Sequence, residues 1–225
     1  MNQADNAPVL AARRIPFEFP EDIERNWIPG EPELSAMMIG ASLTMPYLEP
    51  FLMRTMREAI ERVDDAQLRE DGLGFIGQEG QHYRAHRRFN ETIKAKGYAE
   101  LAAIEAQMEA SYARLSQRSL QVRLAYTAGF ESMTMGVTRW LVEDRVRLFA
   151  NGDPRVVSMV LWHMVEETEH KRVAYDVYQA LFSGGLRGYW CRMVGVFHGS
   201  LDVMRYSMKG YKALLKKDGL WRSPR

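Results

Sequence analysis

The sequence HMVEETEH, at residues 163–170, contains the side chains from which we predict the fold. In an α-helix, residues three or four apart lie on one face. His163, Glu167 and His170 follow each other at steps of four and three, so a helix over this stretch points two imidazoles and a carboxylate the same way. The flanking residues are apolar, and a buried carboxylate is costly unless it is paired or bound to metal. The stretch therefore predicts a helix with metal ligands on its buried face.

A second stretch, EGQH at residues 79–82, offers the same chemistry on another helix. Glu79 and His82 are three residues apart and share a face. Two Glu-x-x-His pairs on separate helices, with one more Glu from each of two other helices, make a carboxylate-bridged two-metal site in a helix bundle. Glu49 and Glu131 are the candidates for those two acids.

The alternative interpretation is that the Glu-x-x-His spacing arises by chance and has no functional meaning. Glu-rich helices produce Glu-x-x-His by chance, and such a pair then lies on a solvated face. Against this alternative, Phe75 and Ile76 precede Glu79, and Trp162 and Met164 flank His163. Several facing carboxylates without a cation would repel each other and raise their own pKa values.

Composition limits the class of protein. The chain has 225 residues, of which 46% are hydrophobic, so we expect one globular domain. Its net charge of +1 argues against a nucleic-acid partner. The single cysteine, Cys191, and a polar N-terminus favour a cytoplasmic location, and no apolar run reaches the roughly 20 residues of a spanning helix.

Helix-forming residues dominate after residue 32, so we predict an all-α fold. Five prolines in residues 1–32 predict an extended N-terminal arm. Residues 33–185 are predicted to form a metal-binding helical bundle, and residues 186–225 an accessory amphipathic helix with a basic tail. The predicted helices span about 33–62, 66–96, 98–115, 118–150, 155–182 and 187–216. Four long helices with one crossover connection predict a four-helix bundle, in which each long helix carries one part of the site.

Two further residues are predicted to support the ligands. His86 follows His82 by one helical turn, and hydrogen bonding to a ligand is the role we favour over ligation. Glu166, next to Glu167, is given the same supporting role.

At these residues the chain resembles the bacterial family labelled predicted metal-dependent hydrolases. The resemblance rests on residues 42–46, 75–90 and 162–171, and it covers about residues 30–220. It implies a ferritin-like fold. Where that family shows a Gly before the first Glu, this chain has Leu48.

The order of ligands is also similar to that of p-aminobenzoate N-oxygenase-type di-iron enzymes. There an additional histidine on the fourth helix completes a site of seven ligands, and His163 occupies that position here.

From these observations we expect a non-haem di-iron oxidoreductase that activates O2 to oxidise a small organic substrate, with an electron donor that the sequence does not identify. Glu79 and Glu167 are the expected bridging ligands, and Glu49 and Glu131 the terminal ones. His82 is assigned to one metal, and His163 with His170 to the other. Carboxylate and imidazole ligands suit iron, then manganese, better than zinc. No catalytic residue separate from these ligands is predicted.

Two other functions fit the same residues. A metal-dependent hydrolase would use a water activated by the two metals. A non-catalytic metal-binding helical protein would handle iron or contact a partner. For the last predicted helix, which combines an aromatic and aliphatic face with basic residues, we favour packing or homodimer formation over contact with an anionic membrane.

Overall fold

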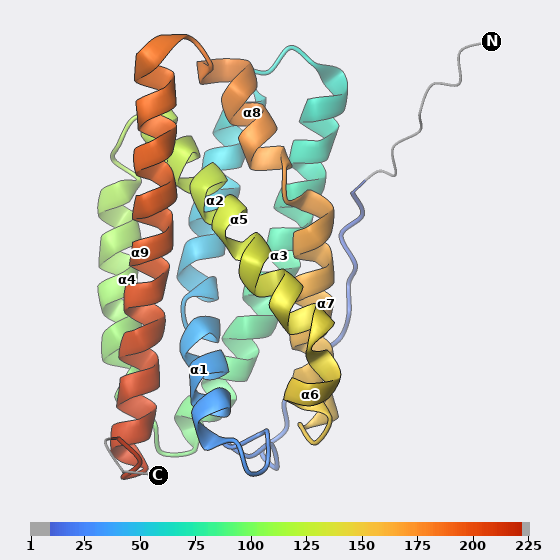
Figure 1. The fold of residues 1–225 in the computed structure, drawn as a ribbon, viewed down its shortest axis with the longest axis vertical. Coiled ribbons are helices and arrows are strands. Elements are labelled where there is room, and N and C mark those ends of the chain that lie inside the picture. The colour runs from blue at the N-terminus through green and yellow to red at the C-terminus, as the bar shows by residue number, and fades with distance from the viewer. Residues whose placement is uncertain (1–9, 222–225) are drawn as a thin grey trace, which may run out of the picture.

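The computed structural model describes residues 10–221, and within that range every regular element is a helix. The predicted all-α bundle is thus confirmed (Figure 1). In chain order the helices are α1 (Pro32–Ser42), α2 (Met45–Ile60), α3 (Ala66–Ala95), α4 (Leu101–Leu115), α5 (Leu120–Glu143), α6 (Arg145–Phe149), α7 (Pro154–His170), α8 (Val173–Phe182) and α9 (Gly185–Lys217).

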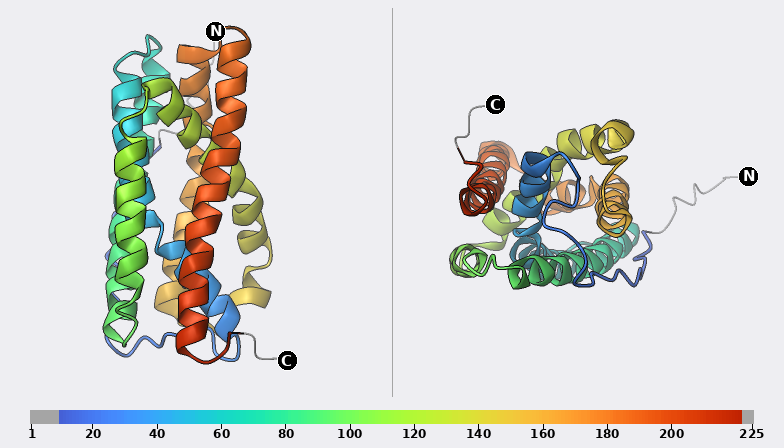
Figure 2. Two further views of the ribbon diagram at one scale, coloured as in Figure 1. Left: turned by 90° about the vertical axis from the view of Figure 1, so that its left-hand side faces the viewer. Right: turned by 90° about the horizontal axis from the view of Figure 1, so that it is seen from below.

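The helices α2, α3, α5 and α7 surround the centre of the bundle. Helix α2 packs along α3, and the oblique helix α5 contacts α2 and α7 (Figure 1). Helix α4 connects the end of α3 to the start of α5 and lies on the outside of the bundle, beside α9 (Figure 2). Every residue that we predicted as a metal ligand lies on one of the four central helices.

The first predicted helix, 33–62, is divided into α1 and α2 between Ser42 and Met45. Proline disfavours helical geometry at the residue before it, and Pro46 lies in the first turn of α2, where its missing N–H has no cost. Pro50 lies inside α2 and cannot donate to the carbonyl of Pro46. Arg87 Nη2 of α3 donates to that carbonyl instead, at 3.3 Å, so α2 continues past Glu49.

Two other long helices that we predicted are also divided. The predicted helix 118–150 is α5 followed by the short α6, with Asp144 between them. The predicted helix 155–182 is α7 and α8, which separate directly after His170. Because of this second division, α8 can pack on α3 and α5 in a direction of its own while α7 keeps its ligand face toward the centre.

The described part of the N-terminal arm, residues 10–31, lies along α3 and α7 (Figure 1). Backbone carbonyls of Ala11, Phe17 and Phe19 accept hydrogen bonds from side chains of α3. Trp27 is buried against Phe149. The predicted arm also includes residues 1–9, which lie outside the described residues, as does the end of the basic tail at 222–225.

Helix α9 packs closely on α5 and α1 through a row of glycines. Gly195 and Gly199 contact the backbone of α5, and Gly210 meets Gly40 of α1. A Cβ at Gly195 would overlap the carbonyl oxygen of Ala125. The row explains how a helix of 33 residues can approach its neighbours so closely. No helix in residues 10–221 is both long and apolar enough to cross a bilayer.

We predict opposite effects on stability for two glycine substitutions. Gly195→Ala should lower the free energy of unfolding by ~1–3 kcal/mol, because the added carbon forces α9 away from α5. Gly136→Ala, on an open face of α5, should raise it by ~0.5–1 kcal/mol, because alanine favours the helix. Urea denaturation followed by circular dichroism measures both. Equal effects of the two substitutions would contradict the close α5–α9 contact.

Candidate metal centre

The structure brings all seven predicted ligands together at the centre of the bundle. Each of them is at most 3% exposed. Their donor atoms form two groups, in each of which the atoms lie within 4.8 Å of one another. The first group is Glu49, His82 and His163, and the second is Glu79, Glu131, Glu167 and His170.

Two carboxylates lie between these groups. Glu79 Oε1 is 3.2 Å from His170 Nε2, whereas its Oε2 is 4.0 Å from His82 Nδ1. Glu167 Oε1 lies 2.9 Å from His163 Nε2 and 3.5 Å from His170 Nε2. Glu79 and Glu167 therefore each lie near histidines of both groups.

The position of His163 differs from the sequence-based expectation, which assigned it with His170 to one metal. His163 Nε2 is 3.7 Å from Glu49 Oε1, and His163 groups with Glu49 and His82. His163 lies one turn before Glu167 and two turns before His170, so it reaches the far side of Glu167. The two groups consequently hold two histidines and one histidine.

The donor atoms fit metal ions because they are otherwise unsatisfied. Both oxygens of Glu49, Glu79 and Glu131 are buried without a hydrogen-bond partner among the described residues, and so are His82 Nδ1 and His170 Nε2. Buried polar groups are nearly always hydrogen-bonded, and leaving one unpaired is costly. A concentration of such atoms at one point is what a coordination site requires.

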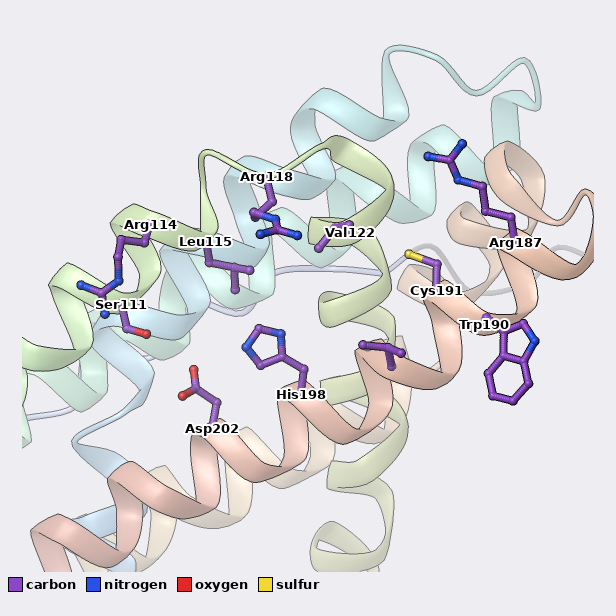
Figure 3. Close-up of a pocket in the computed structure, with 12 residues that line it drawn as sticks. Ser111, Arg114, Leu115, Arg118, Val122, Arg187, Trp190, Cys191, His198 and Asp202 are labelled. Atoms are coloured by element: carbon purple, nitrogen blue, oxygen red, sulfur yellow. The ribbon is translucent and has the colours of Figure 1, made fainter.

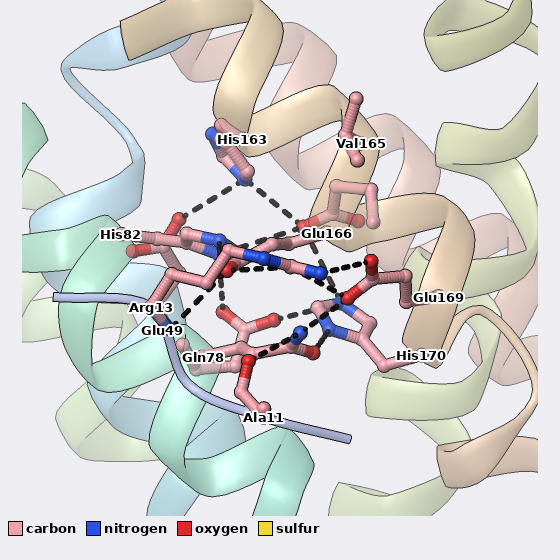
Figure 4. A network of polar contacts seen from close by, with 12 residues as sticks. Ala11, Arg13, Glu49, Gln78, His82, His163, Val165, Glu166, Glu169 and His170 are labelled. Atoms are coloured by element: carbon pink, nitrogen blue, oxygen red, sulfur yellow. Dashed lines mark hydrogen bonds and ion pairs between the residues drawn. The ribbon is translucent and has the colours of Figure 1, made fainter. Parts of the chain in front are cut away.

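The second nitrogen of His82 is held by a chain of charges that reaches the N-terminal arm. His82 Nε2 lies 2.9 Å from Glu166 Oε2, and Glu166 is fully buried. Arg13 Nη1 donates to Glu166 Oε1 at 3.0 Å, and the same guanidinium forms two bonds to Glu169 (Figure 4). Because Glu166 accepts the Nε2 proton of His82, Nδ1 is left as a lone pair that faces the ligand groups.

A second chain of hydrogen bonds orients His163. Asn90 Nδ2 donates to the carbonyl of Ser42, which orients the amide so that its oxygen accepts from the Ser42 hydroxyl at 2.7 Å. Because the Ser42 hydroxyl proton is used in that bond, Ser42 Oγ is the acceptor in its 2.8 Å contact with His86, and His86 Nδ1 is the donor. His86 Nε2 in turn accepts from His163 Nδ1, at 2.7 Å. Burial lowers the pKa of His86 well below its usual value, so His86 is neutral and can take this part.

His170 has a comparable support from α3. Its Nδ1 is 2.9 Å from Gln78 Oε1, and Gln78 Nε2 donates to Glu169 Oε2 at 2.8 Å. Each of the three histidine ligands thus has one nitrogen bonded to protein and the other directed at the carboxylates. This is the arrangement that fixes the tautomer of metal-binding histidines.

Electrostatics in the cluster reflects four acids in one buried space. Burial, and then the charge of Glu79, raises the pKa of Glu49 well above its ordinary value. Burial, and then the charge of Glu167, raises the pKa of Glu131 to about 8. Burial also raises the pKa of Glu79. Glu167 differs: burial raises its pKa, but the contributions of His170 and His163 together outweigh burial and hold that pKa well below the usual value.

In the metal-free protein, therefore, burial favours the protonated forms of Glu49, Glu79 and Glu131. Burial opposes a charge on His170, but the neighbouring carboxylates, Glu167 foremost, together outweigh burial and raise the pKa of His170 well above its usual value. Burial lowers the pKa of His82 and keeps it neutral. Because ligands must be deprotonated to bind, metal binding at this site releases protons.

Several supporting residues could not be recognised in the sequence. His86 and Glu166, both predicted, contact ligands as expected, but Ser42, Asn90 and Arg13 were not predicted. Asn90 could have been indicated by its spacing, because it lies one turn after His86 on α3. Nothing in the sequence connects Arg13 with Glu166, which lies 153 residues away.

A comparison with protein families matches residues 11–225 to the family described as predicted metal-dependent hydrolase. The chain belongs to this family. No curated protein and no solved structure matches the chain. The ferritin-like assignment and the likeness to N-oxygenases accordingly stay expectations, whereas the metal dependence in the family's description agrees with the Glu/His cluster.

We predict that Glu131→Gln stabilises the metal-free protein in a pH-dependent way. The raised pKa of Glu131 means that the folded state favours the protonated acid. That contribution is fully present below the unfolded-state pKa of 4.5 and is lost as the pH rises through about 8. Glutamine imitates the protonated acid at every pH.

The measurement is the thermal midpoint of metal-free protein from pH 5 to 8.5. The gap between Glu131→Gln and the parent should open with pH and reach at least ~2–4 °C, which is about 1 kcal/mol for a chain of this size. Glu109→Gln, on the exposed face of α4, is the control and should follow the parent. A gap that is constant with pH would mean that Glu131 does not titrate in this range.

Proposed function

We propose that the chain is a metal-dependent enzyme whose Glu/His cluster holds two iron ions and oxidises a small organic substrate with O2. The observation that carries the proposal is the donor set itself, three imidazoles and four carboxylates that are buried together, with both oxygens of Glu49, Glu79 and Glu131 lacking a hydrogen-bond partner among the described residues. Four carboxylates balance the charge of two divalent cations, so the loaded centre can be neutral in a buried place. Such nitrogen and oxygen donors suit iron or manganese better than zinc.

Each group of donors would hold one ion. Glu49, His82 and His163 would bind the first, and Glu131 with His170 the second. Glu79 and Glu167, whose oxygens face imidazoles of both groups, would bridge the two. Reduced iron at this place would supply the electrons that O2 activation needs.

The chain's own residues would keep that centre dry and rigid. Burial of all seven ligands excludes bulk water, which would otherwise quench a reactive oxidant. The bond from His86 holds the proton of His163 at Nδ1, and Glu166 holds the proton of His82 at Nε2. Both imidazoles are thereby kept in the tautomer that offers a lone pair to the centre.

The second candidate is hydrolysis, and the family's description is closer to it than to oxidation. In that reaction two divalent ions at the same ligands would supply Lewis acidity. The same ligand residues serve both candidates, so the metal and its reaction with O2 distinguish them.

The test is anaerobic loading with Fe(II), followed by metal analysis and a pulse of O2 observed by absorption spectroscopy. We expect about two iron ions per chain and uptake of O2 by the reduced protein, as in other carboxylate di-iron bundles. Stoichiometric zinc binding with ester or amide hydrolysis, and no reaction of the iron form with O2, would favour the second candidate. Binding of neither metal would contradict both.

We predict that Glu79→Gln reduces bound iron from two ions to less than one per chain. Glutamine keeps the size of the side chain but removes the charge and one bridging oxygen. Loss of a group that only supports a ligand typically costs ~10–100-fold in affinity, and a bridging ligand should cost more. The matched control is Glu70→Gln, on the exposed part of the same helix, which should retain both ions. Two ions still bound to Glu79→Gln would remove Glu79 from the ligand set.

A further inference from the structure

A cavity of about 350 Å³ lies between α1, α5, α7 and α9, beside the metal centre. Its walls are methionine, aliphatic and aromatic side chains with a few hydroxyl groups. Among the described residues that line it there is no Asp, Glu, Lys or Arg, and its ionisable groups are His86 and His163. The cavity is thus an apolar space that ends at a metal ligand.

The cavity extends from the buried centre to the surface. At the inner end, His163 and His86 are 3% and 5% exposed. Thr134 also lines it, and its hydroxyl donates to Glu167 Oε2 at 3.5 Å. The other end is formed by side chains that reach solvent, with exposed fractions of 38–59%: Met37, Val137, Trp140, Met204 and Met208.

A space of this size is not ordinary packing. Protein interiors contain few voids larger than a water molecule, and an unfilled cavity destabilises the fold. Pockets that bind small molecules have volumes of roughly 300–1,000 Å³ and are lined mainly by apolar groups. The cavity meets both conditions and connects solvent with the side chain of His163.

We propose that this cavity is the substrate site of the metal centre, and that the substrate places an uncharged, apolar part such as an unbranched alkyl chain in it. The proposal rests on the proposed function and specifies its substrate class. A charged group in this space would lose its hydration without gaining a partner. The methionines, which are flexible and polarisable, adapt to chains of different shape.

The test is calorimetric titration of metal-free protein with 1-octanol. Octane-1,8-diammonium, which has the same chain length, would have to bury a charge and serves as the charged probe. We expect one saturable site for 1-octanol and no measurable binding of the diammonium ion. Two substitutions that fill the cavity, Ala41→Trp and Met133→Trp, should weaken 1-octanol binding at least ten-fold. The control Ala103→Trp, on the exposed face of α4, should bind like the parent.

The outcomes separate this inference from the proposed function. Equal binding of 1-octanol to the parent and to both filled variants, or no binding to the parent, would overturn the cavity proposal even if two irons bind. Binding of 1-octanol to a chain that takes up no metal would support the cavity and contradict the proposed function. Val137→Glu, which adds a charge at the exposed end without filling the interior, should also weaken binding if ligands enter there.

A different observation concerns the outward face of α9. The face that packs on the bundle holds Gly188, Gly195, Gly199 and Gly210. Apolar side chains also recur on the opposite face at spacings of three or four residues, with exposed fractions between 40% and 79%: Leu186, Trp190, Val194, Phe197, Leu201, Met204 and Met208. A helix that is apolar on both faces requires a second apolar environment.

Arginines lie beside this outward face. A pocket of about 610 Å³ between α4, α5 and α9 is lined by Arg114, Arg118 and Arg187, and all three are exposed without an ion pair in the part of the chain that the structure describes (Figure 3). The acid in its lining, Asp202, accepts a hydrogen bond from Tyr126. Helix α9 itself carries seven basic residues and one acidic residue.

We infer that the outward face of α9 binds the surface of an anionic membrane, with the apolar row at the acyl boundary and the three arginines at lipid headgroups. Basic residues beside an exposed apolar and aromatic row are the pattern of helices that lie in a membrane interface. A second copy of the chain is less suitable as the occupant, because a two-fold contact along α9 would place its basic residues near their own copies.

Flotation with phosphatidylcholine vesicles, with and without phosphatidylserine, tests this inference. We expect the full chain to float only with the anionic vesicles. Phe197→Gln and the double variant Arg118→Gln with Arg187→Gln should each reduce the floated fraction at least five-fold. Val165→Gln and Arg172→Gln, exposed on α7 and directly after it, are the matched controls. No flotation of the parent, or a dimer in sedimentation that Phe197→Gln dissociates, would overturn it.

Discussion

The structure depends on four carboxylates that are buried in one place. Glu49, Glu79, Glu131 and Glu167 come from four different helices and meet in the buried centre of the bundle. Such a concentration of acids destabilises a fold unless protons or cations compensate it. The raised pKa of Glu131 and the cationic partner of Glu167 show how the metal-free chain does so. The negative charge of these buried carboxylates therefore requires compensating positive charge, which bound metal ions would supply.

The histidine ligands are held in place by two successive shells of hydrogen-bonding residues. Glu166, Gln78 and His86 each bind the second nitrogen of one histidine ligand. Arg13 and Ser42 bind those residues in turn. Through Arg13, the described part of the N-terminal arm therefore supports the centre, although no candidate ligand lies in it. The apolar cavity between α1, α5, α7 and α9 reaches His163 without an Asp, Glu, Lys or Arg among the described residues that line it.

The divided helices show where local sequence was insufficient. The expectation of one helix over 155–182 was wrong at Lys171 and Arg172, where no proline or glycine marks an end. The division is a compromise between the ligand face of α7 and the packing of α8 on α3 and α5, which a single straight helix could not satisfy. The first predicted helix also divides in the structure, but there Pro46 gave a local reason.

The sequence by itself determined the all-α class and the seven candidate ligands. The all-α class follows from the helix-forming residues after residue 32. Five of the ligands follow from helical periodicity, which places residues three or four apart on one face whatever the tertiary structure is. Only the tertiary structure decided that His163 groups with Glu49 and His82, because that depends on how α2, α3 and α7 are packed. The same holds for the bonds from Arg13 to Glu166 and Glu169, for the apolar cavity and for the apolar outward face of α9. Each of these arises from contacts between segments far apart in the chain, and such contacts leave no spacing that a sequence can display.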